Sequence, residues 1–552
     1  MTTRREIIAL SAASALAQPA ASDLLTQIIP RHDSSVERTL QMQVTDPASR
    51  WRGIYPDEYG LHNPGTAAGV IDTLLTAYLQ PKSKYHNDKA IPERIQLAAD
   101  FLTRVQSPDG NINLLITNFN SPPDTGFVVR AICPSVTLAK RAGKTDLVRL
   151  VEPFLRKAGN GMTKGGIHTP NHRWVVSAAL AQLYDLFGEA AYVRRIDQWL
   201  AEGIDIDAEG QYSERSTYVY NPITNNAFVT MAAKLKRPQL LDPVRKNLES
   251  MMYLLHPGYE VVTEFSRRQD LNQRGDMGSY WFALAYMANH DKEGRLATMA
   301  RHFASTRAPL SALMEYPDLA TSNVAAAPVP DNYRRVFPHN KFVRVRRGPA
   351  SATILAGNRS RFFTLRNGQA SINAVRFASA FFGRGQFSSE SFQDEDGIIH
   401  LSQDLEAQYY QPLDPARPVN ADEWAATRRD RKRTEVCRLK QTATITETKN
   451  GFRLRLQSSG TNDVPVAVEI NFGAGGKLEG VVPAHKVDDG WVLAKEMGSF
   501  RNGSDVIRFG PGFAENAYTQ IRGAEPKMAG PSVYLTGFTP FDRTIEFTPA
   551  TS

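Results

Sequence analysis

Residues 165–174 bring together several side chains that can handle charge and protons. They read Gly-Gly-Ile-His-Thr-Pro-Asn-His-Arg-Trp and include Asn171, His172, Arg173 and Trp174. The imidazole of His172 has an ordinary pKa of about 6.5, so it can accept a proton near neutral pH. The amide of Asn171 and the guanidinium of Arg173 donate hydrogen bonds to negative groups. The stretch therefore predicts a site that binds an anion and removes a proton, with Arg173 and Trp174 contacting the substrate.

A helix that follows this stretch would position it. Apolar residues recur at the three-four spacing from Val176 to Phe187, and Gly188 is a plausible C-cap. Asn171 then falls near the N-cap of the helix. The N-terminus of a helix carries unpaired N–H groups and positive potential, which suit a carboxylate. The alternative is that Asn171 only caps the helix and that the neighbouring imidazole is a surface residue.

A second polar cluster covers residues 207–221 and leads into another predicted helix. It reads Asp-Ala-Glu-Gly-Gln-Tyr-Ser-Glu-Arg-Ser-Thr-Tyr-Val-Tyr-Asn. Irregular loops with this density of hydroxyl and charged groups often form sites. We therefore take the loop as a candidate site, with Glu214 as a substrate contact and with Asn225 and Asn226 in the following helical turn. The alternative is a packed loop whose tyrosines fill gaps between helices.

A third cluster lies at residues 256–270. Two arginines, Arg267 and Arg268, stand beside the carboxylate of Glu264, with His256 a short distance before them. A guanidinium fork is the side chain best suited to bind a carboxylate with two hydrogen bonds. Paired arginines next to acidic residues also form purely structural ion pairs. The cluster therefore predicts either carboxylate binding or a structural ion-pair network.

The first half of the chain repeats helical patterns separated by short polar turns. In one segment apolar residues from Ile91 to Val105 follow the three-four spacing, and Pro108-Asp109-Gly110 ends it. Such tandem helices, with no strand pattern between them, predict an (α/α) toroid or incomplete barrel. The remaining predicted helices cover residues 68–80, 128–141, 146–157, 190–202, 223–236, 241–255, 278–290 and 293–305.

The second half changes to a period of two. Phe452, Leu454 and Leu456 alternate with arginines, and the same pattern covers 342–346 and 466–472. Such strands, bounded by turns such as Lys-Asn-Gly at 449–451, predict an antiparallel β-sandwich. The proline-containing stretch 325–330 resembles a linker. We predict a helical catalytic domain at 23–320, a linker at 321–335 and a β-sandwich domain at 336–552.

The N-terminus resembles a bacterial export signal. Arg4 and Arg5 precede a short apolar stretch, and Ala15-Leu16-Ala17 has the form of a cleavage site. We therefore expect residues 1–22 to be a twin-arginine-like signal peptide and the protein to be periplasmic or secreted. The alternative is a frayed N-terminal helix. No apolar segment has the length needed to cross a bilayer.

The composition narrows the class of partner. The 552 residues carry a formal charge of +8, which fits either an anionic partner or simply a basic exported protein. The sequence contains no basic run interleaved with aromatics and no zinc-finger spacing, so we expect no nucleic-acid partner. Cys133 and Cys437 have no metal-ligand spacing, and whether they pair is open. We expect no metal and no cofactor.

These features together resemble the heparinase II/III-like polysaccharide lyases. The resemblance rests on the helical repeats, the Asn171–Trp174 element, the loop with Glu214-x-Ser216 and tyrosines, and the β-sandwich tail. It covers nearly the whole chain after the signal, although its motifs are short. It implies an enzyme that cleaves an acidic poly- or oligosaccharide by β-elimination. The family pattern has one tyrosine where this chain offers two, Tyr218 and Tyr220, and we prefer Tyr220.

The chemistry of such a lyase explains the residue types. The enzyme removes the proton at C5 of a uronate and expels the oxygen at C4, so the substrate carboxylate must first be neutralised. The resemblance assigns neutralisation to Asn171, the base to His172 and the acid to Tyr220. The helix N-terminus and Arg268 or Arg267 also suit the neutralising role, because they are preorganised hydrogen-bond donors. Whether the tyrosine is also the base depends on whether the elimination is syn or anti, which the sequence leaves open.

Two other functions compete with this one. A glycoside hydrolase on the same scaffold would need two carboxylates about 5–9 Å apart. Its candidates are Asp109, Asp124, Glu214 and Glu264. A non-catalytic carbohydrate-binding protein would use aromatic platforms such as Trp174, Tyr212 and Trp281. The identity of the glycan, endo or exo action and the oligomeric state stay open.

Overall fold

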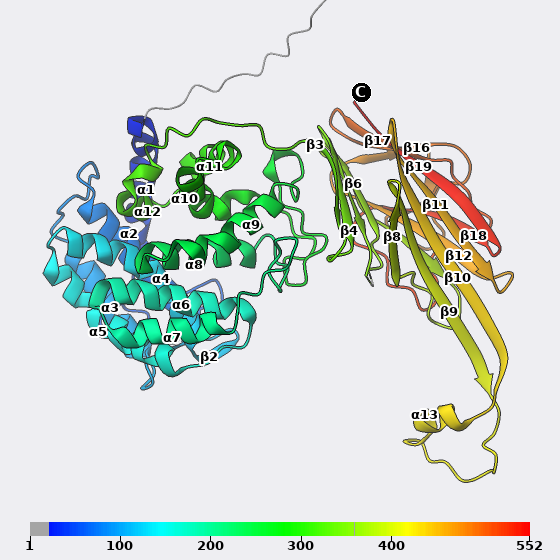
Figure 1. Ribbon diagram of the computed structural model, residues 1–552, viewed down its shortest axis with the longest axis horizontal. Coiled ribbons are helices and arrows are strands. Elements are labelled where there is room, and N and C mark those ends of the chain that lie inside the picture. Colours follow the sequence, from blue (N-terminus) through cyan, green and yellow to red (C-terminus); the bar gives the residue numbers. More distant parts are fainter. Residues whose placement is uncertain (1–20, 358, 552) are drawn as a thin grey trace, which may run out of the picture. The chain divides into compact units, whose positions relative to one another are not determined.

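A computed structural model describes residues 21–357 and 359–551 of the chain. The described residues form two compact units. The helical unit contains the chain up to Glu249 together with Asp276–Val329, and the β-unit contains Ser250–Gly275 and the chain from Pro330 on. The predicted export signal falls on residues that lie almost entirely outside the described part. Figure 1 labels the elements of both units.

The helical unit consists of α-helices joined by short turns. Most helices begin within a few residues of the positions that the periodicity predicts. Helix α2 begins earlier than predicted. Pro64 lies in its first turn, and the side chain of Asn63 accepts a hydrogen bond from the N–H of Gly65 at 2.8 Å. The helices are α1 (Ala21–Met42), α2 (Pro64–Leu79), α3 (Ile91–Val105), α4 (Pro122–Arg141), α5 (Thr145–Lys164), α6 (Pro170–Phe187), α7 (Ala190–Ala201), α8 (Tyr220–Leu235), α9 (Asp242–Met251), α10 (Trp281–Asp291), α11 (Gly294–Arg307) and α12 (Leu310–Glu315).

The even-numbered helices from α2 to α10 form an inner layer, and α3, α5 and α7 lie outside it. Each inner helix packs against the next, and the outer helices pack against their inner neighbours. The inner helices bury residues around most of their circumference, as α6 does from Asn171 to Leu183. The outer helices bury one face only, which is the pattern expected of helices that have solvent on the other side. This arrangement is the predicted α/α toroid.

The sequence did not predict every element of this unit. The helices α1 and α12 and the short strands β1 (Ile112–Leu114) and β2 (Asn118–Ser121) were missed. Pro30, a residue that usually interrupts a helix, lies inside α1, and α12 is only six residues long. The two strands form a small hairpin immediately before α4.

The β-unit contains two large sheets (Figure 1). One has the strand order β13-β16-β17-β19-β11-β10-β9-β8, and the other has the order β14-β15-β18-β12-β7-β6-β5-β4-β3. The short strands among them are β13 (Lys477–Glu479), β14 (Val482–Pro483) and β15 (Gly490–Val492). All pairs are antiparallel except β15 with β18. The strands of 5 or more residues are β3 (Asn332–Phe337), β4 (Phe342–Arg347), β5 (Ala350–Leu355), β6 (Phe363–Asn367), β7 (Ala370–Ser379), β8 (Ser391–Glu395), β9 (Ile398–Tyr410), β10 (Arg433–Thr448), β11 (Gly451–Gly460), β12 (Pro465–Phe472), β16 (Gly498–Asn502), β17 (Asp505–Gly510), β18 (Ser532–Phe538) and β19 (Phe541–Thr551).

Strand β11 shows how alternation builds the sandwich. Leu454 and Leu456 are buried in a core that draws residues from both sheets. The intervening Arg453 and Arg455 lie outside and pair with carboxylates of β19. The predicted turn at 449–451 joins β10 to β11, and a Cβ at Gly451 would lie 2.0 Å from the carbonyl oxygen of Phe547, so glycine is required there. The predicted β-sandwich is confirmed.

The boundaries between the units differ from the predicted ones. Ser250–Gly275 lies inside the range predicted for the helical domain but clusters with the β-unit. Its Leu255 carbonyl accepts hydrogen bonds from Arg344 and Arg346, each at 3.2 Å. Strand β3 begins at Asn332, inside the predicted linker. The helical periodicity at 241–255 gave no sign that residues from Ser250 on belong to the β-unit, because a contact with a distant strand leaves no local sequence pattern.

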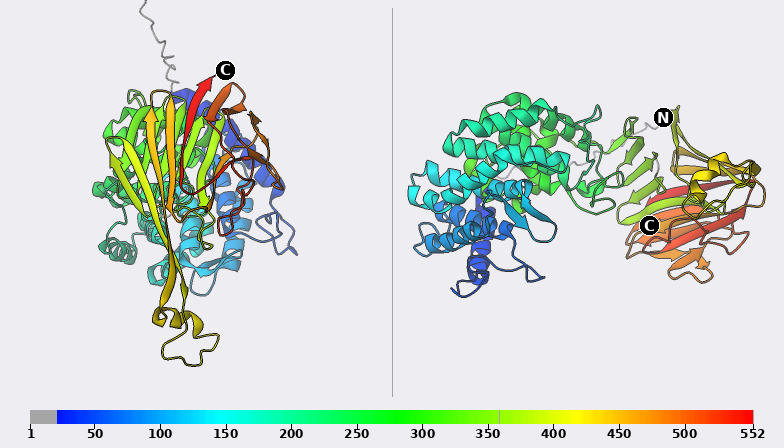
Figure 2. Two further views of the ribbon diagram at one scale, coloured as in Figure 1. Left: turned by 90° about the vertical axis from the view of Figure 1, so that its right-hand side faces the viewer. Right: turned by 90° about the horizontal axis from the view of Figure 1, so that it is seen from below.

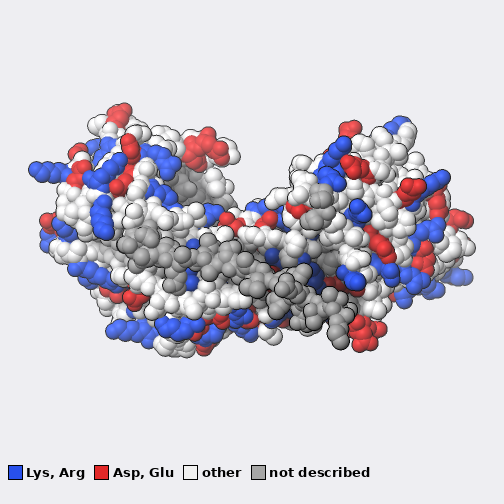
Figure 3. Space-filling view, turned by 90° about the horizontal axis from the view of Figure 1, so that it is seen from above, with Lys and Arg blue, Asp and Glu red and all other residues white. Residues whose placement is uncertain are grey.

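Several features bear on the predicted partners. No helix in the described part of the chain is long and apolar enough to cross a membrane. The described residues contain no group of three or more His, Cys, Asp or Glu side chains placed to hold a metal ion. Cys133 and Cys437 are both free thiols. On the face that Figure 3 shows, basic and acidic side chains are interspersed.

Candidate active site

Helix α6 begins just before the predicted catalytic residues. Thr169 is the N-cap residue and Pro170 the first helical residue, so Asn171 lies inside the first turn. The backbone N–H and the side-chain Nδ2 of Asn171 both donate to Oε1 of Glu214, at 2.9 and 2.5 Å. A carboxylate therefore satisfies the helix N-terminus, where positive potential favours it. The alternative that Asn171 is only the cap of the helix is wrong.

This contact joins two clusters that are 43 residues apart in the sequence. Asn171 and Glu214 are both buried, so the hydrogen bond is sheltered from water. The second contact of Nδ2, with Oγ1 of Thr169, is long at 3.4 Å. The N–H of Nδ2 that points to Thr169 is therefore the one that can donate a hydrogen bond to a ligand instead.

His172 lies among other rings at the start of α6. Its ring meets that of His168 edge to face at a centroid distance of 4.7 Å, and that of Phe127 at 6.5 Å. His172 is 8% exposed, whereas His168 is exposed. His168 is the residue that the sequence reasoning passed over, although it stands in the same stretch. Its imidazole is a second group near His172 that can take or give a proton.

Arg173 and Trp174, predicted to contact the substrate, point inward. The guanidinium of Arg173 pairs with Asp205 at 3.0 Å, and the Nε1 of Trp174 donates to the same carboxylate at 2.9 Å. Trp174 is fully buried. Asp205 also accepts a hydrogen bond from Ser213 at 2.6 Å. These contacts correct the prediction, because the two side chains hold the loop before α8 and leave no face to a sugar.

A chain of hydrogen bonds fixes the centre of the 207–221 loop. The hydroxyl of Tyr212 donates to Oδ1 of Asn225 at 2.8 Å, and Nδ2 of Asn225 donates to Asn247 at 2.8 Å. Asn247 in turn donates to the carbonyl of Gly210 at 2.7 Å. Burial raises the pKa of Tyr212 well above its usual value, so the phenol stays protonated. Asn225 is fully buried and structural, which corrects its predicted role in binding substrate.

Tyr218 and Tyr220 lie where the loop becomes helix α8. Tyr220 is the first residue of α8, and its N–H donates to Oγ of Ser216 at 3.0 Å. Both tyrosines are half-buried, unlike Tyr212. Arg215, with φ of 49°, makes the bend that precedes them. Both phenols therefore stay candidates for the proton donor.

The first turns of several inner helices meet at one end of the helical unit. The hydroxyl of Tyr280, just before α10, donates to the carbonyl of Thr217, just before α8. Asn226 on α8 donates to the carbonyl of Ser279 at 3.3 Å and accepts from the N–H of Ala283 at 3.2 Å. Together with the Phe127–His172 and Asn171–Glu214 contacts, these place the N-termini of α4, α6, α8 and α10 together. The carboxylate of Glu214 already lies at the N-terminus of α6, so the positive ends of the neighbouring helices are the ones that can attract a further anion.

The third predicted cluster belongs to the β-unit. Nε2 of His256 lies 2.9 Å from Oε1 of Glu264, and its Nδ1 lies 2.6 Å from Oγ of Ser351. Burial and the nearby charges of Arg366 and Arg344 lower the pKa of His256 to about 3. The ring is therefore neutral at pH 7. Burial alone would raise the pKa of Glu264, but His256 and the arginines hold it well below its usual value.

The paired arginines lie in a turn of the same unit. Arg267 is exposed and Arg268 half-buried. Arg359 clamps the turn by donating to the carbonyls of Phe265 and Ser266, at 3.1 and 3.0 Å. The predicted site residues are thus divided, with His256, Glu264, Arg267 and Arg268 in the β-unit and the other nine in the helical unit.

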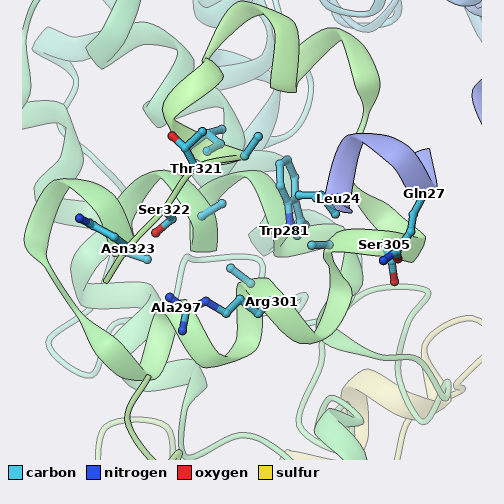
Figure 4. A pocket seen from close by; sticks show the side chains of 15 residues that line it. Leu24, Gln27, Trp281, Ala297, Arg301, Ser305, Thr321, Ser322 and Asn323 are labelled. Atoms are coloured by element: carbon cyan, nitrogen blue, oxygen red, sulfur yellow. The ribbon is translucent and has the colours of Figure 1, made fainter. Parts of the chain in front are cut away.

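Trp281, considered as an aromatic platform, is 2% exposed. It forms part of the wall of a cavity of about 350 Å³ between α1, α10 and α11 (Figure 4). Alanines of α10 and α11 line much of this cavity. The indole Nε1 is buried and has no hydrogen-bond partner among the described residues. Trp281 therefore offers no exposed ring face on which a sugar could stack.

The two-part architecture is that of the polysaccharide lyases that combine a helical toroid with β-sheets. A heparan sulfate lyase of Pedobacter heparinus, HepC, is 10% identical over 97% of this chain and 84% of its own, with a TM-score of 0.53. The chondroitin AC lyase of Streptomyces coelicolor A3 is 14% identical over 97% and 80%, with a TM-score of 0.56. A Paenibacillus xanthan lyase is 10% identical over 97% and 58%, with a TM-score of 0.58.

No family model and no curated protein matches the sequence. At 10–14% identity, the likeness to the solved structures concerns the fold. The fold that the resemblance to heparinase II/III-like lyases implied is therefore confirmed, and the chemistry has to be argued from the site.

Proposed function

We propose that the protein is a polysaccharide lyase that cleaves a uronic-acid-containing glycan by β-elimination. The support for this proposal is a set of contacts that links α4 to α6, and α6 and the segment before α10 to the loop before α8. Asn171 and His172 lie in the first turn of α6, and Tyr218 and Tyr220 lie where that loop becomes α8. An anion-binding end of the toroid is combined there with an imidazole and two phenols. The structural neighbours, whose names identify lyases of heparan sulfate, chondroitin and xanthan, support the same class of reaction.

The first task of the site is to neutralise the substrate carboxylate. A carbanion-like intermediate next to a carboxylate would carry a second negative charge, so preorganised donors lower the barrier. The amide of Asn171, held in place by Glu214, and the helix N-termini supply these donors. Removing one such donor typically slows catalysis about 100- to 1000-fold. We assign Asn171 to this role.

The second task is to move two protons. The base must accept the C5 proton, and the acid must protonate the C4 oxygen as its bond breaks. We assign the base to His172, with His168 beside it, and the acid to Tyr220 or Tyr218. In a syn elimination one of the tyrosines would perform both steps, because proton and leaving group then lie on one face of the sugar.

The experiment is a screen of the purified protein against a panel of uronate polymers. Lyase products contain a C4–C5 double bond conjugated with the carboxylate and absorb in the near ultraviolet. We expect absorbance to rise with at least one polymer. His172→Ala and either Tyr220→Phe or Tyr218→Phe should reduce the rate about 100- to 10 000-fold, the range for general acid–base groups. Tyr184→Phe, on the same helix α6 but towards its other end, is the matched control and should keep full activity.

The outcomes separate the competing functions. Cleavage without the absorbance would indicate a glycoside hydrolase. Two of the candidate carboxylates of such a hydrolase already accept hydrogen bonds within the protein. Asp124 accepts from Ser121 and Asn118, and Glu214 accepts from Asn171. Binding without turnover would indicate a carbohydrate-binding protein. Full activity in both tyrosine variants would contradict the assignment of the acid.

We also propose that residues 1–22 direct export to the periplasm or the medium. The support is the pair Arg4-Arg5 before an apolar stretch. Replacement of both arginines by lysine in the full chain should leave the protein in the cytoplasm. Unchanged export of this variant would contradict a twin-arginine signal.

A further inference from the structure

Strands β9 and β10 continue beyond the sandwich as an arm. Between them the chain from residue 411 to 432 forms a long excursion that contains the short helix α13 (Trp424–Thr427) and the turn η5 (Arg428–Asp430). Figure 1 and the left panel of Figure 2 show this excursion at the far end of the two strands. We call residues 408–433 the arm. Of the residues of the arm only Thr427 is buried, so the arm adds little to the core.

The arm concentrates positive charge on its returning side. Residues 424–433 carry five Arg or Lys residues and one Asp. In the described part of the chain no carboxylate pairs with Arg428 or Lys432, and Arg429 only approaches its exposed neighbour Asp430 at 3.8 Å. Glu406 is shared by Arg433 at 2.8 Å and Arg438 at 3.0 Å. Over the whole arm, six Arg and Lys residues face four Asp and Glu residues, and Arg417 pairs with Glu423 at 3.6 Å. The excess of positive charge is therefore confined to the returning side.

Exposed aromatic rings accompany these cations. Trp424 is 47% exposed, and the guanidinium of Arg431 lies 4.3 Å from the centre of its ring. Tyr409 on the stem of the arm is 59% exposed and packs edge to face on Phe382, which is also exposed. Exposed aromatic rings next to arginines are an arrangement suited to sugars, which stack on the rings while their acidic groups meet the guanidinium groups.

A hollow on the arm brings some of these groups together. It has a volume of about 530 Å³ and lies between the stem and the α13–η5 segment. Within it, Nε2 of Gln408 donates to the hydroxyl of Tyr410 at 2.6 Å. Its lining residues are Gln408, Tyr410, Ala425, Ala426, Arg428, Arg429 and Arg433. The hollow is thus lined by three guanidinium groups together with a phenol and an amide.

We propose that the arm is a second binding surface for an acidic polysaccharide, separate from the groups assigned to catalysis. Arg428, Arg429 and Lys432 would bind carboxylate or sulfate groups, and Trp424 would stack on a sugar ring. The affinity for a polyanion follows from the arm alone, whereas its identification as a glycan rests on the proposed function. A second copy of the arm is disfavoured as occupant, because two surfaces with the same excess charge repel each other.

The test compares binding of two polyanions by the full-length protein. The probes are heparin, which carries sulfates, and polygalacturonate, which carries only carboxylates, with neutral dextran for comparison. Binding is measured in the Tyr220→Phe background to limit cleavage. The arm variant is Arg428→Gln, Arg429→Gln and Lys432→Gln, all exposed side chains without a strong partner. We expect its Kd for one or both polyanions to rise about tenfold, with a weaker dependence of binding on salt.

A matched control removes three other cations from the β-unit. Lys477→Gln, Lys495→Gln and Arg508→Gln lower the charge equally at exposed positions outside the arm. This variant should bind as the parent does. Equal weakening in both triple variants would overturn the proposal, because net charge alone would then explain the binding. Trp424→Ala should weaken polysaccharide binding several-fold, and unchanged binding would overturn the stacking role.

Two further measurements distinguish other occupants and the proposed function. An arm-dependent change from dimer to monomer in light scattering would show that the arm binds another copy, and tighter arm-dependent binding of duplex DNA would show a nucleic-acid surface. Either result overturns the proposal. With otherwise native protein, the arm variant should keep its rate on short uronate oligosaccharides and lose it on dilute polymer. Arm-dependent polyanion binding without any turnover would leave the surface established and the proposed lyase function wrong.

Discussion

The pair Asn171 and Glu214 shows how a single contact links two parts of the site. One carboxylate oxygen accepts both the backbone N–H and the amide of Asn171, and the carboxylate lies at the positive end of α6. Glu214 is therefore a positioning residue for the amide. It also takes part in the stability of the helix N-terminus, where a side-chain cap is absent.

Replacing Glu214 tests both roles. Glu214→Gln keeps an oxygen that can accept the hydrogen bonds but removes the charge, so we expect a loss of about 1 kcal/mol in the free energy of unfolding. Glu214→Ala should lose more stability and reduce kcat with little change in KM. Urea unfolding and steady-state rates measure these effects. Glu58→Gln, at an exposed position of the helical unit, is the control. A fully active Glu214→Ala would contradict the positioning role.

The buried pair His256 and Glu264 makes the β-unit sensitive to acid. The folded pKa of His256, about 3, lies below its unfolded value of about 6.5, so the unfolded state binds the proton first as the pH falls. The lowered pKa of Glu264 acts in the same direction at lower pH. Stability is therefore lost as the pH falls from about 6.5 towards 3.

His256→Gln should flatten this loss, because glutamine can keep hydrogen bonds to Ser351 and Glu264 without binding a proton. The measurement is the melting temperature of the β-unit between pH 7 and pH 4. Ser351→Ala removes the partner of Nδ1 and a 3.3 Å hydrogen bond from Arg344 but keeps the imidazole, so it should leave the slope in place. The same pH slope in His256→Gln and the parent would contradict the assignment.

At the scale of elements, Asp72 on α2 lies where α2 meets α4 and α12. Burial raises the pKa of Asp72 to about 7, and the nearby hydroxyls of Ser135 and Ser311 only partly offset this. Oγ of Ser311 lies 3.3 Å from the carboxylate. Above about pH 4 the unfolded chain loses the proton while the folded protein keeps it, so stability falls as the pH rises from 4 to 7.

Asp72→Asn should remove this penalty. We expect the variant to be more stable than the parent by about 1–2 kcal/mol at pH 8, since the residue keeps some exposure, and equally stable at pH 4. Denaturant titrations at the two pH values measure the difference. Asp146→Asn, at a highly exposed position on α5, should show no such dependence on pH. Equal effects of Asp72→Asn at pH 4 and pH 8 would mean that the carboxyl does not titrate in this range.

At the scale of the whole molecule, the β-unit is assembled from two separate parts of the sequence. Ser250–Gly275 supplies the carbonyl of Leu255 to the fully buried Arg344, and its Val262 is also buried. A fragment of residues 330–552 lacks these contacts and would leave Arg344 partly unpaired. We expect this fragment to aggregate or to unfold without a cooperative transition.

A second fragment keeps this prediction testable. Residues 250–275 joined by a Gly/Ser linker to 330–552 should fold and melt cooperatively, as followed by circular dichroism. Equal solubility and melting temperature of the two fragments would show that the inserted segment is dispensable.

Much of this architecture was readable from the sequence because periodicity is local. The stripe from Ile91 to Val105 and the alternation around Leu454 each report which side of an element is buried, whatever it packs against. The helical first half and the stranded second half follow from such patterns, whereas the resemblance to toroid lyases also rested on the Asn171–Trp174 element and on the loop with Glu214 and the tyrosines. The choice of Asn171 and His172 followed from residue type and from the helix predicted after them.

Only the tertiary structure decided which partners these residues have. Arg173 and Trp174 have the side chains of a binding site, yet Asp205 draws both inward, and Asn225 is held by Tyr212 and Asn247. Glu214, 43 residues away, satisfies the N-terminus of α6. A sequence pattern encodes the tendency of a side chain to be buried or to hydrogen-bond, but the partner is set by long-range packing, in which residues distant along the chain compete for the same carboxylate or carbonyl.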